Sequence, residues 1–271
     1  MEKIKDALKK AKTDLVLNKK SVSLLRNHLP QVRHDEVLEK IVYNQENVVD
    51  IDKDHLEKHR IVAMDKMNPA SWSFDALRTQ VLQKLEENNW KTIGIISPTA
   101  AAGKTVVAIN LAISIAQSPQ KTAMVVDFDM RKPKVTSYLG IKYKKSINDY
   151  LKGDAEISDI IINPSIPRFT VIPTSKPVSK SSEVLSLSKV KSLISDLKDK
   201  YDSRVVIFDL PPILQADDAM VILPHFDCVL LVVGDGADTE ADLMQTMRLL
   251  EKANILGVVV NRAEVEPKAY Y

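Results

Sequence analysis

Cysteine is almost absent from this chain. Cys228 is the single cysteine among 271 residues, which excludes an intramolecular disulfide framework and a zinc site built from cysteines, and fits a reducing cytoplasm. Long apolar runs are missing as well, because none approaches the roughly 20 residues that a helix needs to span a bilayer. An excess of one charge is also missing, since 38 basic and 36 acidic side chains leave a net charge of +2. Affinity for nucleic acid or acidic lipid through bulk charge is therefore excluded.

Glycine is scarce and unevenly placed. All seven glycines lie between Gly94 and Gly257, which confines tight backbone turns to the C-terminal two thirds of the chain. The opening residues are too polar for a secretory signal, and apolar residues then recur at helical spacing among lysines. We interpret residues 1–43 as a helical leader with a docking stripe for a partner, and contact with membrane headgroups as the alternative. Residues 44–70 show no sustained period and are predicted to be a linker.

Short apolar strands and helices alternate from Ser71 onward. The strands are near-continuous runs of Val, Ile and Leu, as expected for a parallel sheet that is covered on both faces. The chain over residues 71–266 is therefore predicted to be an α/β domain with a doubly wound, mostly parallel sheet, whose ligands lie beyond the carboxyl ends of the strands. Strands are expected over 92–96, 122–126, 169–172, 205–208, 228–233 and 256–260, and helices over 73–86, from Gly103 onward, and over 183–198 and 239–253.

One strand–loop–helix unit has the pattern of a phosphate-binding loop. Residues 97–105 read Ser-Pro-Thr-Ala-Ala-Ala-Gly-Lys-Thr between a strand and a helix. In such a loop, backbone N–H groups and the helix N-terminus face the phosphates, the lysine neutralises their charge and the threonine hydroxyl ligates Mg²⁺. Pro98 stands at the first glycine of G-x-x-x-x-G-K-[ST], so this segment alone leaves a helix cap with an exposed lysine equally open.

Three carboxylates follow two other apolar strands. Asp127 and Asp129 lie at positions i and i+2 after one strand, which places both side chains on the same side, and Asp209 ends another. Buried like charges repel, so a cation or a substrate proton is expected between these acids and the phosphates. One acid at a strand end is often only a cap. Three acids beside Gly-Lys-Thr favour a site for Mg²⁺ and a nucleotide.

These motifs resemble those of the bacterial tyrosine kinases (BY-kinases) of capsule and exopolysaccharide synthesis, which belong to the deviant-Walker class of P-loop NTPases. The resemblance covers about residues 70–261. Residues 97–105 resemble Walker A, residues 125–131 resemble Walker A′ (apolar-Asp-x-Asp-x-Arg), and residues 208–212 resemble Walker B with its double proline. Thr99 stands where the division and partitioning ATPases carry a second lysine, which favours the kinase branch.

The resemblance implies a role for each motif residue. Asp127 would accept the proton of the attacking tyrosine hydroxyl, and Lys104 would hold the β- and γ-phosphates. Thr105, Asp129 and Asp209 would organise Mg²⁺, with Asp129 also assisting catalysis. Asn261 stands where related enzymes read the base, although a strand-end cap is an equal alternative. The implied contacts to ATP are Thr99, Ala100, Ala101, Ala102, Gly103, Lys104, Thr105, Val106, Arg131 and Asn261.

Two features depart from the family pattern. Family members usually end in a cluster of tyrosines that accept phosphate, and here only Tyr270 and Tyr271 are present. We expect these two to be the phosphoacceptors, reached in trans by a neighbouring subunit of a homo-oligomer. The family's oligomerisation motif Glu-x-x-Arg-x-x-Arg reads Trp72, Asp75 and Arg78 at its three positions, so only the last arginine is kept.

The sequence thus predicts an ATP- and Mg²⁺-dependent protein-tyrosine autokinase that regulates exopolysaccharide chain length or export. The resemblance implies a polytopic membrane chain-length regulator as its activating partner, no nucleic acid, and a cytoplasmic location held at the inner face of the membrane by that partner. A nucleotide-switched scaffold or ATPase of the export complex is the alternative, favoured by the altered motif and the short tyrosine tail. The intact acids Asp127, Asp129 and Asp209 favour the kinase, and Thr99 opposes a positioning ATPase.

Overall fold

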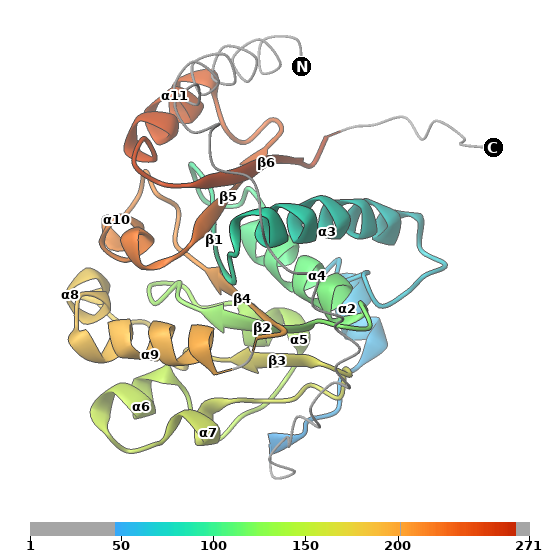
Figure 1. Cartoon of the computed structure of the whole chain (residues 1–271), viewed down its shortest axis with the longest axis vertical. Coiled ribbons are helices and arrows are strands. Elements are labelled where there is room, and N and C mark those ends of the chain that lie inside the picture. The colour runs from blue at the N-terminus through green and yellow to red at the C-terminus, as the bar shows by residue number, and fades with distance from the viewer. Residues whose placement is uncertain (1–46, 201, 264–271) are drawn as a thin grey trace, which may run out of the picture.

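The sheet confirms the predicted α/β architecture. A computed structural model describes residues 47–200 and 202–263 (Figure 1), so the leader expected over 1–43 and the tail expected over 267–271 lie outside the described residues. Six parallel strands form one sheet in the order β3-β2-β4-β1-β5-β6. The strands are β1 Thr92–Ile96, β2 Thr122–Asp127, β3 Phe169–Ile172, β4 Arg204–Asp209, β5 Cys228–Gly234 and β6 Ile255–Asn261.

Helices cover both faces of the sheet, each over its own apolar core (Figure 1). One face carries α2 Lys53–Lys58, α3 Pro69–Asn88, α4 Lys104–Ala116 and α5 Val135–Leu139. The other face carries α6 Ile147–Lys152, α7 Ile157–Ile160, α8 Ser181–Leu185, α9 Ser188–Asp199, α10 Asp218–Ile222, the 3-10 helix η2 Leu223–His225 and α11 Glu240–Leu249. Among the helices of the described residues, none is long and apolar enough to cross a membrane.

Strands β1 to β5 are buried along their whole length, whereas the edge strand β6 is partly exposed. Burial on both faces explains why their sequences are apolar without alternation. The parallel register between β2 and β4 sets Asp127 directly beside Asp209. Strand β1 lies on the other side of β4, so the loop after it opens at the same edge of the sheet. The fold therefore brings the predicted motif segments together.

The chain between residues 47 and 70 is packed, and the prediction of a linker is wrong for this stretch. Leu56 of α2 and Ile61 are 3% exposed and belong to the core beside α4. The buried Asn110 side chain of α4 accepts hydrogen bonds from the backbone N–H groups of Val62 and Ala63, at 2.7 and 2.9 Å. A six-residue helix is too short to show a helical period, and this is why the segment resembled a linker.

Several helix boundaries differ from those predicted. The helix expected over 183–198 is two helices, α8 and α9, separated at residues 186 and 187. Helix α3 begins earlier than expected, at Pro69, because Asn68 caps it and proline suits the first helical turn. Helix α11 ends at Leu249. The short helices α5, α6, α7 and α10 were not predicted, since each has four to six residues.

Candidate nucleotide-binding and catalytic site

The loop between β1 and α4 has a backbone suited to anions. Ala101 and Gly103 have positive φ angles of 65° and 92°. Such alternation turns successive N–H groups into a concave anion site, and a non-glycine residue held there marks a functional turn. No side chain caps the 13-residue helix α4, so its first N–H groups are available to a phosphate. A Cβ atom at Gly103 would lie 2.0 Å from Asn261 Nδ2, so only glycine fits.

Asp127 is fully buried and has one oxygen without a partner. Its Oδ2 atom accepts hydrogen bonds from the backbone N–H groups of Lys134 and Val135, both at 3.0 Å. Its Oδ1 atom has no hydrogen-bond partner among the described residues. Burial and the neighbouring Asp209 raise the pKa of Asp127 well above its usual value. The unmatched oxygen is therefore available to accept a proton from a substrate.

Lys104 joins the other two carboxylates. Its Nζ atom lies 3.0 Å from Asp129 Oδ2 and 3.4 Å from Asp209 Oδ1, and Thr105 Oγ1 donates to Asp209 Oδ2 at 2.6 Å. Burial opposes the charge of Lys104, but Asp209 and Asp129 outweigh it and raise its pKa. Burial also raises the pKa of Asp209, although Lys104 and Thr105 oppose that shift. With Asp127 included, three acids share one ammonium group, which leaves room for a further positive charge.

This donor set fits a magnesium ion that is held partly by its substrate. Mg²⁺ prefers oxygen ligands and usually takes one or two carboxylates together with phosphate oxygens. The hydroxyl of Thr105 and the carboxylates of Asp209 and Asp129 are such ligands, gathered at one place. Over residues 47–200 and 202–263, no three His, Cys, Asp or Glu side chains form a metal cluster on their own. Phosphate oxygens would have to complete the coordination.

The structure places the remaining predicted contacts unevenly. Asn261 lies against the loop, where its Nδ2 atom donates to the carbonyl oxygen of Ala102 at 2.8 Å. Thr99, Ala100 and Ala101 are at least partly exposed and Val106 is half-buried. Arg131 points elsewhere: its guanidinium group pairs with the buried Asp218 of α10, at 2.9 Å. The predicted contact between Arg131 and the nucleotide is therefore not supported by this arrangement.

Two residues of the site were missed in the sequence. Asp238, which follows β5, accepts hydrogen bonds from the Thr99 N–H group, from Thr99 Oγ1 at 2.5 Å and from the Gly234 N–H group at 2.7 Å. It thus holds the start of the phosphate loop against the end of β5. Thr174, after β3, donates to the carbonyl oxygen of Asp127 at 2.6 Å. The signal for both was available, because each is a polar residue just beyond an apolar strand.

A helix N-terminus in an anion-binding loop, a lysine, a hydroxyl and converging carboxylates define a P-loop nucleotide-binding protein. A family model described as an AAA domain matches residues 90–254, which is more than half of the chain. The chain belongs to this family.

Curated relatives and solved structures show which members of this family the chain is similar to. Tyrosine-protein kinase CpsD of Streptococcus agalactiae is 28% identical over 200 residues, which cover 73% of this chain and 85% of CpsD. Tyrosine-protein kinase Etk of Escherichia coli K12 is 31% identical over 199 residues, covering 72% of this chain but only 27% of Etk. The kinase domain of Escherichia coli Etk superposes with a TM-score of 0.68 at 29% identity, over 78% of this chain and 84% of that domain. The resemblance to the bacterial tyrosine kinases is confirmed.

A more distant structure shares the nucleotide-binding fold. The septum site-determining protein MinD of Pyrococcus horikoshii, solved with Mg-ADP, has a TM-score of 0.55 and 26% identity over 66% of this chain and 75% of MinD.

Proposed function

We propose that this chain is an ATP- and Mg²⁺-dependent protein-tyrosine kinase that phosphorylates Tyr270 and Tyr271 of a neighbouring copy and regulates exopolysaccharide chain length or export. The observation that carries the proposal is the free oxygen of the buried Asp127, next to the cluster of Lys104, Asp129 and Asp209. A protein that only binds a nucleotide has no need of an unpaired buried carboxylate beside its phosphate loop. The names of the curated relatives support the same activity.

The chemistry follows from charge and position. Thr105, Asp209 and Asp129 would hold Mg²⁺, which would offset charge on the phosphates. Lys104 neutralises the β- and γ-phosphates, and the loop N–H groups hold them in place. The tyrosine oxygen forms a bond to the γ-phosphorus while the bond from that phosphorus to the bridging oxygen breaks and ADP leaves. The hydroxyl proton passes to Asp127 Oδ1, and the raised pKa of Asp127 makes it a better base than an ordinary aspartate.

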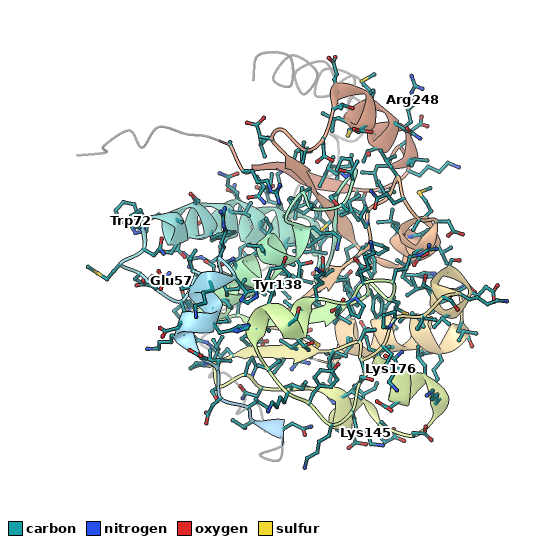
Figure 2. The ribbon with its side chains drawn as sticks, turned by 180° about the vertical axis from the view of Figure 1, so that it is seen from behind. Glu57, Trp72, Tyr138, Lys145, Lys176 and Arg248 are labelled. Carbon is teal, nitrogen blue, oxygen red and sulfur yellow. The ribbon has the colours of Figure 1, made fainter. Side chains whose placement is uncertain are left out.

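The proposal includes the setting of the reaction. We propose a polytopic membrane chain-length regulator as the activating partner, residues 1–43 as the docking leader, and a peripheral position at the inner face of the membrane. We also propose a homo-oligomer, with a contact that differs from the family motif. Asp75 binds Lys66 and Arg78 of its own chain at 2.7 and 3.0 Å, so Arg78 is already engaged. Trp72 lies near the start of α3, the helix that also carries Asp75 and Arg78. Its side chain is 62% exposed and points away from the body of the molecule (Figure 2).

Labelled ATP tests the activity. Purified chain is incubated with ATP labelled on the γ-phosphate, with and without a peptide from the candidate regulator. We expect label on Tyr270 or Tyr271 that disappears in Lys104→Met, in Asp127→Asn and in the double variant Tyr270→Phe/Tyr271→Phe. Free phosphate without labelled protein would instead identify an ATPase or a nucleotide-switched scaffold. Mixing the Tyr270→Phe/Tyr271→Phe variant with the Asp127→Asn variant tests transfer between copies, because the second variant can be labelled on its terminal tyrosines only by the active site of the first.

A further inference from the structure

Positive charge is concentrated beside the proposed catalytic acid. Residues 131–145, which we name the basic segment, carry six basic side chains and no acidic one, in a chain whose net charge is only +2. The basic segment begins directly after the Walker A′ acids and includes α5. Its basic residues are Arg131, Lys132, Lys134, Lys142, Lys144 and Lys145.

The basic segment forms the immediate surroundings of both acids. Its backbone N–H groups at Lys134 and Val135 bind Asp127, and the N–H group of Lys132 binds Asp129 Oδ1 at 3.0 Å. A tyrosine hydroxyl that reaches Asp127 therefore lies within a few ångströms of this backbone. Each residue of an extended peptide advances about 3.3 Å, so residues a few positions from that tyrosine are within reach of the basic segment.

Four of the six charges are exposed and have no ionic partner among the residues that the structure describes. Arg131 is held by Asp218, and Lys145 donates to the carbonyl oxygen of Asp154 at 3.0 Å. The exposed side chains of Lys132, Lys134, Lys142 and Lys144 form no ion pair with any residue in the described part of the chain. Their charges are thus available to a ligand.

Lys142 and Lys144 are directed outward by the chain itself. They alternate with the buried Ile141 and the half-buried Tyr143, the pattern of an extended strand with one face on the core. Tyr143 packs against the core that contains Val135 and Leu139 of α5, which ties this stretch to the part of the basic segment that holds Asp127. Figure 2 labels Lys145 at the far end of the basic segment, on the outer surface.

We propose that the basic segment binds acidic residues that lie a few positions before the substrate tyrosine, and that its occupant is residues 264–271 of a second copy. That stretch carries Glu264 and Glu266, six and four positions before Tyr270, and one basic residue, Lys268, which lies between them and the tyrosines. The inference rests on the proposed function for the identity of the site. Exposed charges of this kind select partners and speed their association more than they add affinity, and salt screens them. The basic segment would therefore favour tyrosines preceded by acids.

A charge exchange tests the inference. A fluorescent peptide of residues 262–271 is titrated with the full chain in the presence of Mg²⁺ and a non-hydrolysable ATP analogue. We expect Lys142→Glu/Lys144→Glu to weaken binding roughly tenfold, as expected for several exposed charge pairs acting together. A peptide with both Glu264 and Glu266 replaced by Lys should bind this variant better than it binds the unmodified chain.

Two controls isolate the effect of position. The variant Lys191→Glu/Lys252→Glu makes the same change of charge at exposed lysines of α9 and of the turn after α11, and should bind the peptide as the unmodified chain does. Affinity for the ATP analogue should be equal in all variants, which shows that the fold and the phosphate loop are intact. As a further test, raising the salt concentration should weaken binding of the unmodified peptide to the unmodified chain, because salt screens the attraction between the two glutamates and the lysines of the basic segment.

The outcomes separate the inference from the proposed function. Equal binding of both peptides, or the same loss in the control variant, would overturn the inference. A second measurement uses vesicles of equal parts phosphatidylglycerol and phosphatidylcholine. The inference is also overturned if Lys142→Glu/Lys144→Glu abolishes binding of the chain to these vesicles and leaves peptide binding unchanged, because the basic segment would then bind a membrane. Charge-dependent binding without phosphate transfer from labelled ATP supports the inference and contradicts the kinase.

Discussion

Two carboxylates at opposite ends of the sheet show how burial can serve structure or chemistry. Asp227 precedes β5 at the amino end, and its oxygens accept hydrogen bonds from the backbone of Lys91 and Thr92, from the Thr92 hydroxyl and from Lys198. Burial would raise the pKa of Asp227, but these donors outweigh it and lower the pKa. Asp127 at the carboxyl end has a raised pKa and one oxygen with no hydrogen-bond partner among residues 47–200 and 202–263. The first carboxylate joins parts of the fold, and the second is kept for a substrate.

Replacing each acid by its amide should have opposite effects on stability. In Asp227→Asn an amide group would face Lys198, so we expect the free energy of unfolding to fall by about 2–4 kcal/mol. In Asp127→Asn a buried charge is removed, and the oxygen that faces Lys134 and Val135 is kept. We therefore expect the free energy of unfolding to stay equal or to rise by about 1–3 kcal/mol. Urea unfolding measures both.

Activity should change in the reverse order. Loss of a general base lowers rates by about 10²–10⁴-fold, so Asp127→Asn should lose phosphate transfer while Asp227→Asn, assayed well below its unfolding temperature, should keep it. If Asp127→Asn were the less stable of the two, Asp127 would be a structural residue and the comparison would fail.

The pH dependence of stability sharpens the same contrast. A carboxyl whose pKa is raised by folding stabilises the folded state fully only below its ordinary pKa of about 3.9, and loses that contribution as the pH rises through the folded value. The advantage of Asp127→Asn over the unmodified chain should therefore grow as the pH rises above about 4, by about 1.4 kcal/mol for each pH unit between the two pKa values. Urea unfolding from pH 4 to 8 measures this slope.

Asp227 should show the opposite trend. Folding lowers its pKa, so its contribution is complete above its ordinary pKa and is lost as the pH falls through the folded value. The deficit of Asp227→Asn should be full at pH 7 and shrink towards acid pH. Parallel curves for the two variants would contradict the assignment of the two roles.

Asp238 is an intermediate case, because its oxygens are satisfied but it lies at the functional end. Its bonds to Thr99 and Gly234 hold the phosphate loop against β5. We expect Asp238→Ala to lower affinity for an ATP analogue by about fivefold to tenfold, as expected for the loss of one or two net hydrogen bonds, and to leave the rate at saturating ATP nearly unchanged. Thr99→Val, which removes only the hydroxyl, should have a smaller effect. A loss of rate with unchanged affinity would contradict a positioning role.

Local pattern was sufficient for the strands and for the centre of the site. The apolar strands and the spacing of Lys104, Asp127, Asp129 and Asp209 depend on near neighbours in sequence, and the structure brings those four side chains together as expected. Whether they act as assigned remains a prediction. The partner of Arg131 depended on an acid 87 residues away, which no local motif identifies.

Other features required the folded chain. The bond between Thr99 and Asp238 joins residues 139 positions apart. Packing of residues 47–70 depends on Asn110 of α4, whose side chain also donates to the carbonyl oxygen of Arg60. A short helix whose packing and hydrogen-bond partners lie far away in the sequence has too little periodicity of its own to be recognised.

The position of β4 determines when the site can exist during synthesis. Strands β1 and β2 pair with β4 and not with each other, so the phosphate loop and the Walker A′ acids lack a common support until residues 204–209 are available. A nascent chain that has exposed only its first two hundred residues holds most of the motif residues and still has no Asp209 for Lys104 and Thr105. We therefore expect the complete nucleotide site to form only after β4 has paired with β1 and β2. Nucleotide binding by a nascent chain would then show that this pairing has taken place.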